Sequence, residues 1–217
     1  MPRGLFVTGT DTNVGKTVVC AALMHRYRSA VPLRYWKPIQ TGIEHDDDAS
    51  EVRRLAGCEV ATGTRLPRPV SPHLAAKWSG QNIRLNEMKL PSESGTWIVE
   101  GAGGVLVPLN ETDLMADLMR SLGFPVLVVA RSGLGTINHT LLTIEALRAR
   151  GLCVAGVVMV GDPNSDNREA IEHHGRIQVL AEMPRLESID GTLDAGRLAQ
   201  WAATELDPHR RLLEFLR

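Results

Sequence analysis

A glycine-rich loop near the start of the chain constrains the fold more than any other feature. Residues 9–17 read Gly-Thr-Asp-Thr-Asn-Val-Gly-Lys-Thr. They follow the apolar run Leu5-Phe6-Val7 and precede a helical pattern over 17–30. A strand, a loop ending in Gly-Lys-Thr and a helix together match a Walker A phosphate-binding loop, although the first glycine stands one position early. The chain is therefore expected to hold phosphate groups at the start of its first helix.

The loop has a direct physical rationale. Backbone N–H groups of the loop and of the helix start point at a bound anion, and the helix dipole favours its negative charge. Lys16 is expected to reach the outer phosphates of a nucleotide. Thr17 is expected to place its hydroxyl on Mg²⁺.

Short apolar runs alternate with longer amphipathic segments along the rest of the chain. The pattern predicts strands over 33–36, 96–99, 125–130, 153–160 and 177–181. It predicts helices over 136–150 and 193–216, the second broken near Pro208. Strands that are apolar throughout indicate a parallel sheet covered on both faces. We expect a single α/β domain over 1–217, doubly wound, with a mostly parallel sheet, helices on both faces and the ligand at the carboxyl ends of the strands.

Composition excludes several classes of function. The chain has 217 residues, 43% of them hydrophobic, which is incompatible with a disordered chain. With 24 basic and 25 acidic side chains, it offers no electrostatic footprint for nucleic acid or a membrane surface. Its three cysteines are too widely spaced for a disulfide framework or a metal pair. No apolar run approaches the length of a membrane helix or a signal peptide, so we expect a cytoplasmic protein.

A second lysine is expected close to the loop. Lys37 follows the strand over 33–36, and Pro38 is expected to end that strand. Lys37 would then lie at a carboxyl end, where it suits a second negative group, either a transferred phosphoryl group or an anionic nucleophile. The alternative is a solvated lysine at a strand exit.

Two acidic features are candidate magnesium ligands. His45-Asp46-Asp47-Asp48 precedes a helix running to about Ala56, so these acids either cap that helix or face a metal ion. Glu100 ends an apolar strand and precedes a glycine-rich turn. A carboxylate in that position meets the metal at a bound nucleotide.

Five motifs together resemble the dethiobiotin synthetase family. They are the loop at 9–17, Lys-Pro-x-x-Thr-Gly at 37–42, Ser-Pro-His at 71–73, Val-Glu-Gly-Ala-Gly-Gly at 99–104 and Leu-Gly-x-Ile-Asn-His at 134–139. The match runs to about Pro184 and is weak over 58–91 apart from Ser-Pro-His. The resemblance implies a ligase that forms the ureido ring of dethiobiotin from 7,8-diaminopelargonic acid, CO₂ and ATP with Mg²⁺. It also implies a homodimer.

The resemblance further implies a set of site residues. Lys37 matches the active-site lysine and acts with Lys16. Mg²⁺ falls to Thr17, Glu100 and an aspartate of the acidic run, where spacing to the next helix favours Asp47 and leaves Asp48 one position away. The substrate is expected at Thr12, Thr41, Thr136, Ile137 and Asn138. The nucleotide is expected at Asn13, Val14, Gly15, Lys16, Thr17, Glu100, Gly101, Ala102, Gly103, Gly161, Asp162, Pro184, Arg185 and Leu186.

The start of the helix at Thr136 is expected to bind the substrate's carboxylate, and the resemblance implies that this helix comes from the partner subunit across a two-fold interface. Free N–H groups and the positive end of the dipole make a helix start an anion site, and the phosphate loop already occupies the first one.

Two alternative functions belong to other classes. One is a P-loop ATPase switch of the partition or septum-positioning type. Such proteins carry an extra lysine near the start of the loop, where this chain has Asp11. The other is a cobyrinate-type amidating enzyme, which usually has a glutaminase domain for which this chain has no room.

Overall fold

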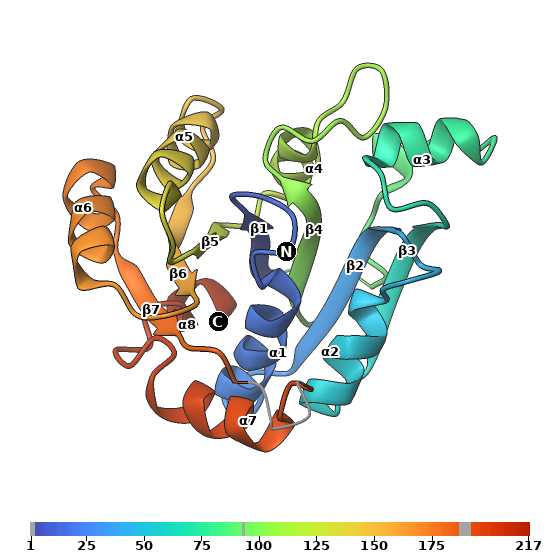
Figure 1. Cartoon of the computed structure of the whole chain (residues 1–217). Coiled ribbons are helices and arrows are strands. Elements are labelled where there is room, and N and C mark those ends of the chain that lie inside the picture. Colours follow the sequence, from blue (N-terminus) through green and yellow to red (C-terminus); the bar gives the residue numbers. More distant parts are fainter. Residues whose placement is uncertain (1–2, 93, 187–191) are drawn as a thin grey trace.

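The computed structural model describes residues 3–92, 94–186 and 192–217, and seven strands of this part form one parallel sheet. The order across the sheet is β3-β2-β4-β1-β5-β6-β7, and each neighbouring pair runs parallel. This confirms the expected α/β fold (Figure 1). The strands are β1 (Arg3–Gly9), β2 (Leu33–Thr41), β3 (Val60–Leu66), β4 (Thr96–Gly104), β5 (Val126–Arg131), β6 (Val154–Val160) and β7 (Val179–Met183).

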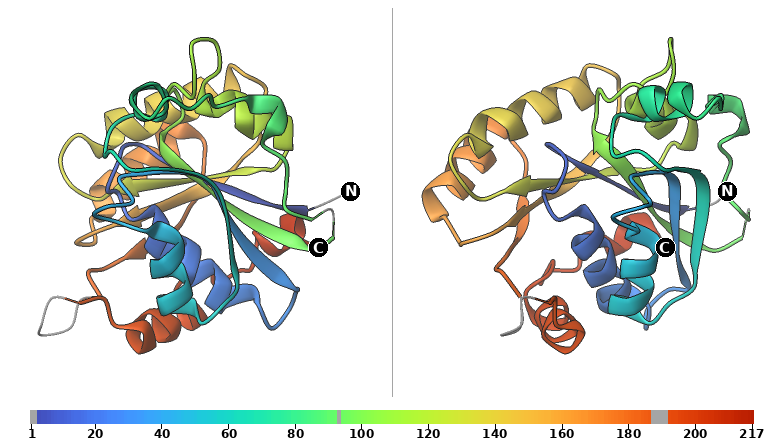
Figure 2. Two further views of the ribbon diagram at one scale, coloured as in Figure 1. Left: turned by 90° about the vertical axis from the view of Figure 1, so that its right-hand side faces the viewer. Right: turned by 45° about the vertical axis from the view of Figure 1, so that its right-hand side comes forward.

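Helices cover both faces of the sheet, as Figure 2 shows from two sides. Side chains of β1 alternate between the two cores, with Leu5 and Val7 in one and Phe6 in the other. Strands buried on both faces are largely apolar on both sides for this reason. One face carries α1 (Lys16–Tyr27), α2 (Asp48–Ala56), α7 (Ala195–Thr204) and α8 (Leu213–Leu216). The other carries α3 (Pro72–Trp78), α4 (Met115–Leu122), α5 (Thr136–Arg148) and α6 (Ser165–Gly175), with a short 3₁₀ turn at Leu85–Glu87.

The second strand is longer than the sequence predicts. Pro38 was expected to end it, but β2 continues to Thr41. Its pairing with β4 stops at Trp36, and from Lys37 onward it pairs only with β3. A strand that is paired on one side can accommodate a proline, which has no N–H to donate. Lys37 therefore lies inside a strand and not at its exit, which corrects the prediction.

The sequence prediction missed β3, α3 and α4. β3 is one of the two edge strands, and only Leu66 in it is fully buried, so it lacks the apolar run by which the other strands were recognised. The predicted break in the last helix is confirmed, because the chain turns between α7 and α8 at Asp207. The carboxylate of Asp207 accepts hydrogen bonds from the backbone N–H groups of Arg211 and Leu212 and from the hydroxyl of Tyr27. Over the described residues, no helix has the length and apolarity to cross a membrane.

Candidate functional site

The glycine-rich loop joins β1 to α1, and the helix begins at Lys16. Gly15 has φ 97°, a left-handed conformation, and a Cβ added there would lie 3.1 Å from Val160. Lys16 Nζ donates to the carbonyl of Asp11 at 3.0 Å and so closes the loop on itself. In the part of the chain described, no side chain caps the start of α1 and its first turn holds no acid, so its N–H groups remain open to an anion.

A fully buried carboxylate, that of Glu100 in β4, forms the centre of the site. Lys37 of the neighbouring strand β2 donates from Nζ to Glu100 Oε1 at 2.8 Å. Thr17, in the first turn of α1, reaches the same oxygen at 3.0 Å. The hydroxyl of Tyr35 donates to the other oxygen, Oε2, at 2.8 Å. Three elements that are distant in sequence thus meet at one side chain.

The two aspartates that begin α2 have different roles. Asp48 lies with the site, because its Oδ2 is 2.5 Å from Lys37 Nζ and its Oδ1 is 2.8 Å from the Thr17 hydroxyl. Asp47 caps α2 by accepting from the backbone N–H of Ser50, and it pairs with Arg65 at 3.0 Å. The spacing argument favoured Asp47 as the metal ligand. The structure brings Asp48 to Glu100 instead and gives Asp47 the capping role.

The charges of this cluster depend on one another. Burial opposes the charge of Lys37, but Glu100 and Asp48 outweigh it and hold the pKa of Lys37 above its usual value. Burial also raises the pKa of Asp48, and the Lys37 ammonium outweighs that effect, so the pKa lies below its usual value. For Lys16, burial is the larger effect and lowers the pKa. Two cations and two carboxylates are therefore held together next to the phosphate loop.

The donor atoms fit a magnesium ion. Mg²⁺ prefers hard oxygen ligands, and the hydroxyl of Thr17 lies within hydrogen-bond distance of carboxylates of both Asp48 and Glu100. A loop threonine and a carboxylate from a neighbouring strand hold Mg²⁺ in P-loop proteins generally. Thr17, Asp48 and Glu100 are the residues that would hold it here.

A cavity of about 630 Å³ lies beside the loop, at the carboxyl ends of β1, β2 and β4. Its wall also includes residues that sequence reasoning missed, Gln40, Pro69, Val70 and Val107 among them. Two quoted motifs signalled this wall, because Gln40 lies within 37–42 and Ser71 and Pro72 belong to Ser-Pro-His. Two predicted residues contribute differently: Val14 packs into the core, and the Gly101 carbonyl accepts from Lys37. The predicted residues that line the cavity are Thr12, Asn13, Gly15, Lys16, Thr17, Lys37, Thr41, Asp48, Glu100, Ala102 and Gly103.

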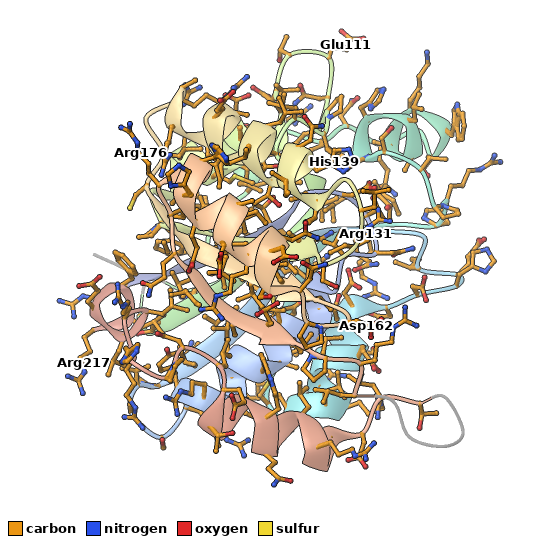
Figure 3. The ribbon with its side chains drawn as sticks, turned by 60° about the vertical axis from the view of Figure 1, so that its left-hand side comes forward. Glu111, Arg131, His139, Asp162, Arg176 and Arg217 are labelled. Carbon is orange, nitrogen blue, oxygen red and sulfur yellow. The ribbon has the colours of Figure 1, made fainter. Side chains whose placement is uncertain are left out.

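The residues predicted for the nucleotide base lie at the edge formed by β6 and β7. The N–H of Gly161 donates to the carbonyl of Met183 at 2.9 Å, which places 161–162 beside 184–186. This edge adjoins the loop through Val160 and Gly15, but its residues do not line the cavity described above. In Figure 3, Asp162 and Arg131, the last residue of β5, lie on the same side of the molecule.

The predicted carboxylate site at the start of α5 also lies apart from that cavity. Thr136 is buried, whereas Asn138 is exposed. Leu134, just before the helix, is fully exposed, and Leu142 on the helix is more than half exposed. The structure therefore does not bring Thr136, Ile137 and Asn138 to the phosphate loop of the same chain.

Fold and site together define a P-loop nucleotide-binding protein. The sequence model of a family described as an AAA domain matches residues 3–192. The ATP-dependent dethiobiotin synthetase BioD of Paramagnetospirillum magneticum is 50% identical over 196 residues, which are 89% of this chain and 94% of that protein. The enzyme of the same name from Brucella ovis is 46% identical over 193 residues, 87% of this chain and 89% of that one. The chain belongs to the dethiobiotin synthetase family.

A further relative is a larger protein. The biotin biosynthesis bifunctional protein BioCD of Bordetella avium is 50% identical over 194 residues, and the chain spans only 41% of its length. Among solved structures, apo McdA of Cyanthece aligns with a TM-score of 0.59 at 13% identity and covers both chains fully. The cell division ATPase MinD of Pyrococcus furiosus gives 0.56 at 17% identity, covering 93% of this chain and 97% of that one. At this level of identity, the two structures support the fold alone.

Proposed function

We propose that this chain is an ATP-dependent dethiobiotin synthetase, a ligase that closes the ureido ring of dethiobiotin from 7,8-diaminopelargonic acid, CO₂ and ATP. The observation that carries the proposal is the pair of buried lysines, Lys16 and Lys37, facing one cavity beside the phosphate loop. A protein that only binds and hydrolyses ATP has no need of the second. The names and identities of the relatives support the same activity.

The reaction brings several negative charges together. One amine of the diamine adds to CO₂ and loses a proton, which gives a carbamate. A carbamate oxygen attacks the γ-phosphorus, and ADP leaves as the carbamic–phosphoric anhydride forms. The second amine then attacks the carbamate carbon and loses a proton, and inorganic phosphate leaves as the ring closes. Catalysis of this sequence requires positioning and opposing charge more than a covalent nucleophile.

Residues of the cavity supply that charge. Lys16 is placed for the outer phosphates of ATP, and Lys37 for the point where carbamate oxygen meets the γ-phosphate. Lys37 is held by Glu100 and Asp48 in its charged form, so it is pre-organised before the substrate arrives. Thr41 and Thr12 line the same cavity and offer hydroxyls to the amines. Thr17, Asp48 and Glu100 would hold Mg²⁺, which would supply positive charge to the phosphates of a bound nucleotide.

The substrate's own carboxylate is proposed to bind at a second subunit. The start of α5 in the partner would receive it, through the backbone N–H groups at Thr136, Ile137 and Asn138. Exposed Leu134 and Leu142 favour a surface that a second copy covers. The nucleotide base is proposed to lie against Gly161, Asp162, Pro184, Arg185 and Leu186.

The competing reading is an ATPase switch of the partition or septum-positioning type. Those proteins use a lysine near the start of the loop, whereas Asp11 stands here and pairs with Arg131 at 2.5 Å. An acidic residue that is held by an arginine cannot supply the positive charge that the switch requires.

The decisive experiment measures ADP release by the pure protein with diaminopelargonate and bicarbonate added separately and together. We expect turnover only when both are present, with dethiobiotin formed in equal amount. Steady ATP hydrolysis that neither substrate changes would overturn the synthetase assignment and favour the switch.

A further inference from the structure

We propose that Tyr35 is a positioning residue that orients Glu100 for magnesium binding. This role rests on the proposed nucleotide and magnesium site. Tyr35 is fully buried in β2, and its ring belongs to the apolar core under α1. Its hydroxyl, however, donates to Glu100 Oε2 at 2.8 Å.

The two oxygens of Glu100 have separate partners. Oε1 accepts from Lys37 at 2.8 Å and from Thr17 at 3.0 Å, so it faces the phosphate loop. Oε2 accepts a hydrogen bond from the Tyr35 hydroxyl. The phenol therefore decides which oxygen faces the loop and at what angle the carboxylate plane is held.

Strand register explains how the phenol reaches this oxygen. Tyr35 pairs with Ile98 across β2 and β4. Side chains two positions apart on a strand share a face, so Tyr35 and Lys37 lie on one face of β2, and Glu100 lies on the corresponding face of β4. Lys37 meets Glu100 from the site end of the strands, and Tyr35 meets it from the core end. Glu100 is thus held from two directions along the sheet.

The Tyr35 hydroxyl would affect metal binding indirectly, through the Glu100 carboxylate that it orients. Partners that hydrogen-bond to a metal-binding carboxylate fix its orientation, and their removal typically costs about 10- to 100-fold in metal affinity. A fully buried carboxylate that loses a donor on one oxygen also turns more freely. We therefore expect Tyr35 to set the affinity for Mg²⁺ while contacting neither metal nor nucleotide.

The chain contains its own matched control. It has two tyrosines, Tyr27 and Tyr35, and both are fully buried. The hydroxyl of Tyr27 donates to Asp207, a buried carboxylate at the turn before α8. Tyr27→Phe removes the same type of hydrogen bond from a place that does not touch the site.

The experiment titrates Mg²⁺ calorimetrically into the full chain saturated with a non-hydrolysable ATP analogue. For Tyr35→Phe we expect the Kd of Mg²⁺ to rise about tenfold, and binding of the analogue without metal to stay within about twofold of wild type. Turnover should fall at limiting Mg²⁺ and recover at saturating Mg²⁺. Tyr27→Phe should lower the Tm and leave the Kd of Mg²⁺ unchanged.

A Kd of Mg²⁺ within about twofold of wild type in Tyr35→Phe would overturn the role, as would an equal rise in Tyr27→Phe. Tyr35→Met, which keeps an apolar side chain without a donor, carries the same expectation if the phenylalanine variant does not fold. A second check combines Tyr35→Phe with Glu100→Gln, where the tyrosine change should add no further loss of metal affinity. The calorimetric readouts do not use the diamine, so a failure of the synthetase assignment would leave them intact.

Discussion

At the scale of single residues, the site depends on opposite charges that have been removed from water together. Lys37 and Glu100 are both buried and lie 2.8 Å apart, and Asp48 completes the group. Burying a charge is costly unless it is paired and hydrogen-bonded. Removing one member leaves the remaining buried charges with fewer partners. Substitutions here should therefore change both the chemistry and the stability of the protein.

Lys37→Ala should reduce kcat severely. In the proposed reaction the lysine stabilises charge that develops between carbamate and γ-phosphate, and losing such a group costs on the order of 3 kcal/mol, about a hundredfold in rate. Steady-state kinetics with all three substrates saturating measures the effect. Lys89→Ala, at an exposed lysine, is the control. Near-normal turnover in Lys37→Ala would show that this lysine has only a structural role in its ion pairs.

Metal affinity should separate the two neighbouring aspartates. Asp48→Asn and Glu100→Gln should each raise the Mg²⁺ concentration needed for half-maximal turnover, and Glu100→Gln should raise it more because the buried strand fixes its position. Asp47→Asn should leave that concentration near the wild-type value, since Asp47 faces Arg65 and the backbone of α2. A Mg²⁺ titration of activity decides this. If Asp47→Asn and Asp48→Asn changed the required Mg²⁺ concentration equally and only slightly, the acidic run would have no role beyond stabilising the start of α2.

At the scale of elements, local features could be predicted from the sequence, and contacts between distant elements could not. The loop at 9–17 was predictable because its residue spacing is a local property of one strand, loop and helix. Contact between Lys37 and Glu100 spans 63 positions and depends on β2 lying beside β4. Tyr35 was missed because an aromatic ring in an apolar run looks like any core residue. Pro38 misled the prediction because β2 is paired on one side only from Lys37 onward, where a proline can be accommodated.

The start of α2 offers a pH test. Chiefly through its hydrogen bond to Arg65, Asp47 has its pKa lowered to about 2. An aspartate in the unfolded chain has a pKa of about 3.9. The charged Asp47 therefore stabilises the folded state fully above that pH, and this stabilisation is lost as the pH falls through the pKa of Asp47 in the folded protein. Asp47→Asn keeps a capping side chain but loses the ion pair. The Tm of this variant should be lower than that of wild type at pH 7. The difference between the two Tm values should become smaller as the pH falls from about 4 to 2. A constant gap over that range would contradict the ion pair with Arg65.

At the scale of the whole molecule, the two ends of the proposed substrate need different sites. Its amines must meet the γ-phosphate in the cavity at β1, β2 and β4, while an aliphatic chain carries its carboxylate away from the phosphates. Thr136, Ile137 and Asn138 at the start of α5 do not line that cavity. This helix start would instead bind the carboxylate of a substrate molecule whose amines lie in the cavity of the neighbouring subunit. The substrate site would then need residues from both subunits of a dimer, whereas the nucleotide site would need those of one subunit only.

This arrangement predicts that dissociating the dimer separates substrate binding from nucleotide binding. Leu134→Asp with Leu142→Asp places charge on the two exposed leucines at α5 and should yield monomers by sedimentation. The monomer should bind the ATP analogue with a Kd within about twofold of wild type, but it should need a much higher concentration of diaminopelargonate for turnover.

The methyl ester of diaminopelargonate offers a second test of the same site. In wild type, the ester should bind at least about tenfold more weakly than the acid, because one charged hydrogen-bonded contact is worth about 1.5 kcal/mol or more. The acid and its ester should bind alike to the monomer, since the helix start that distinguishes them is gone. Equal affinity of wild type for acid and ester, or full activity in a monomer, would remove α5 from the substrate site.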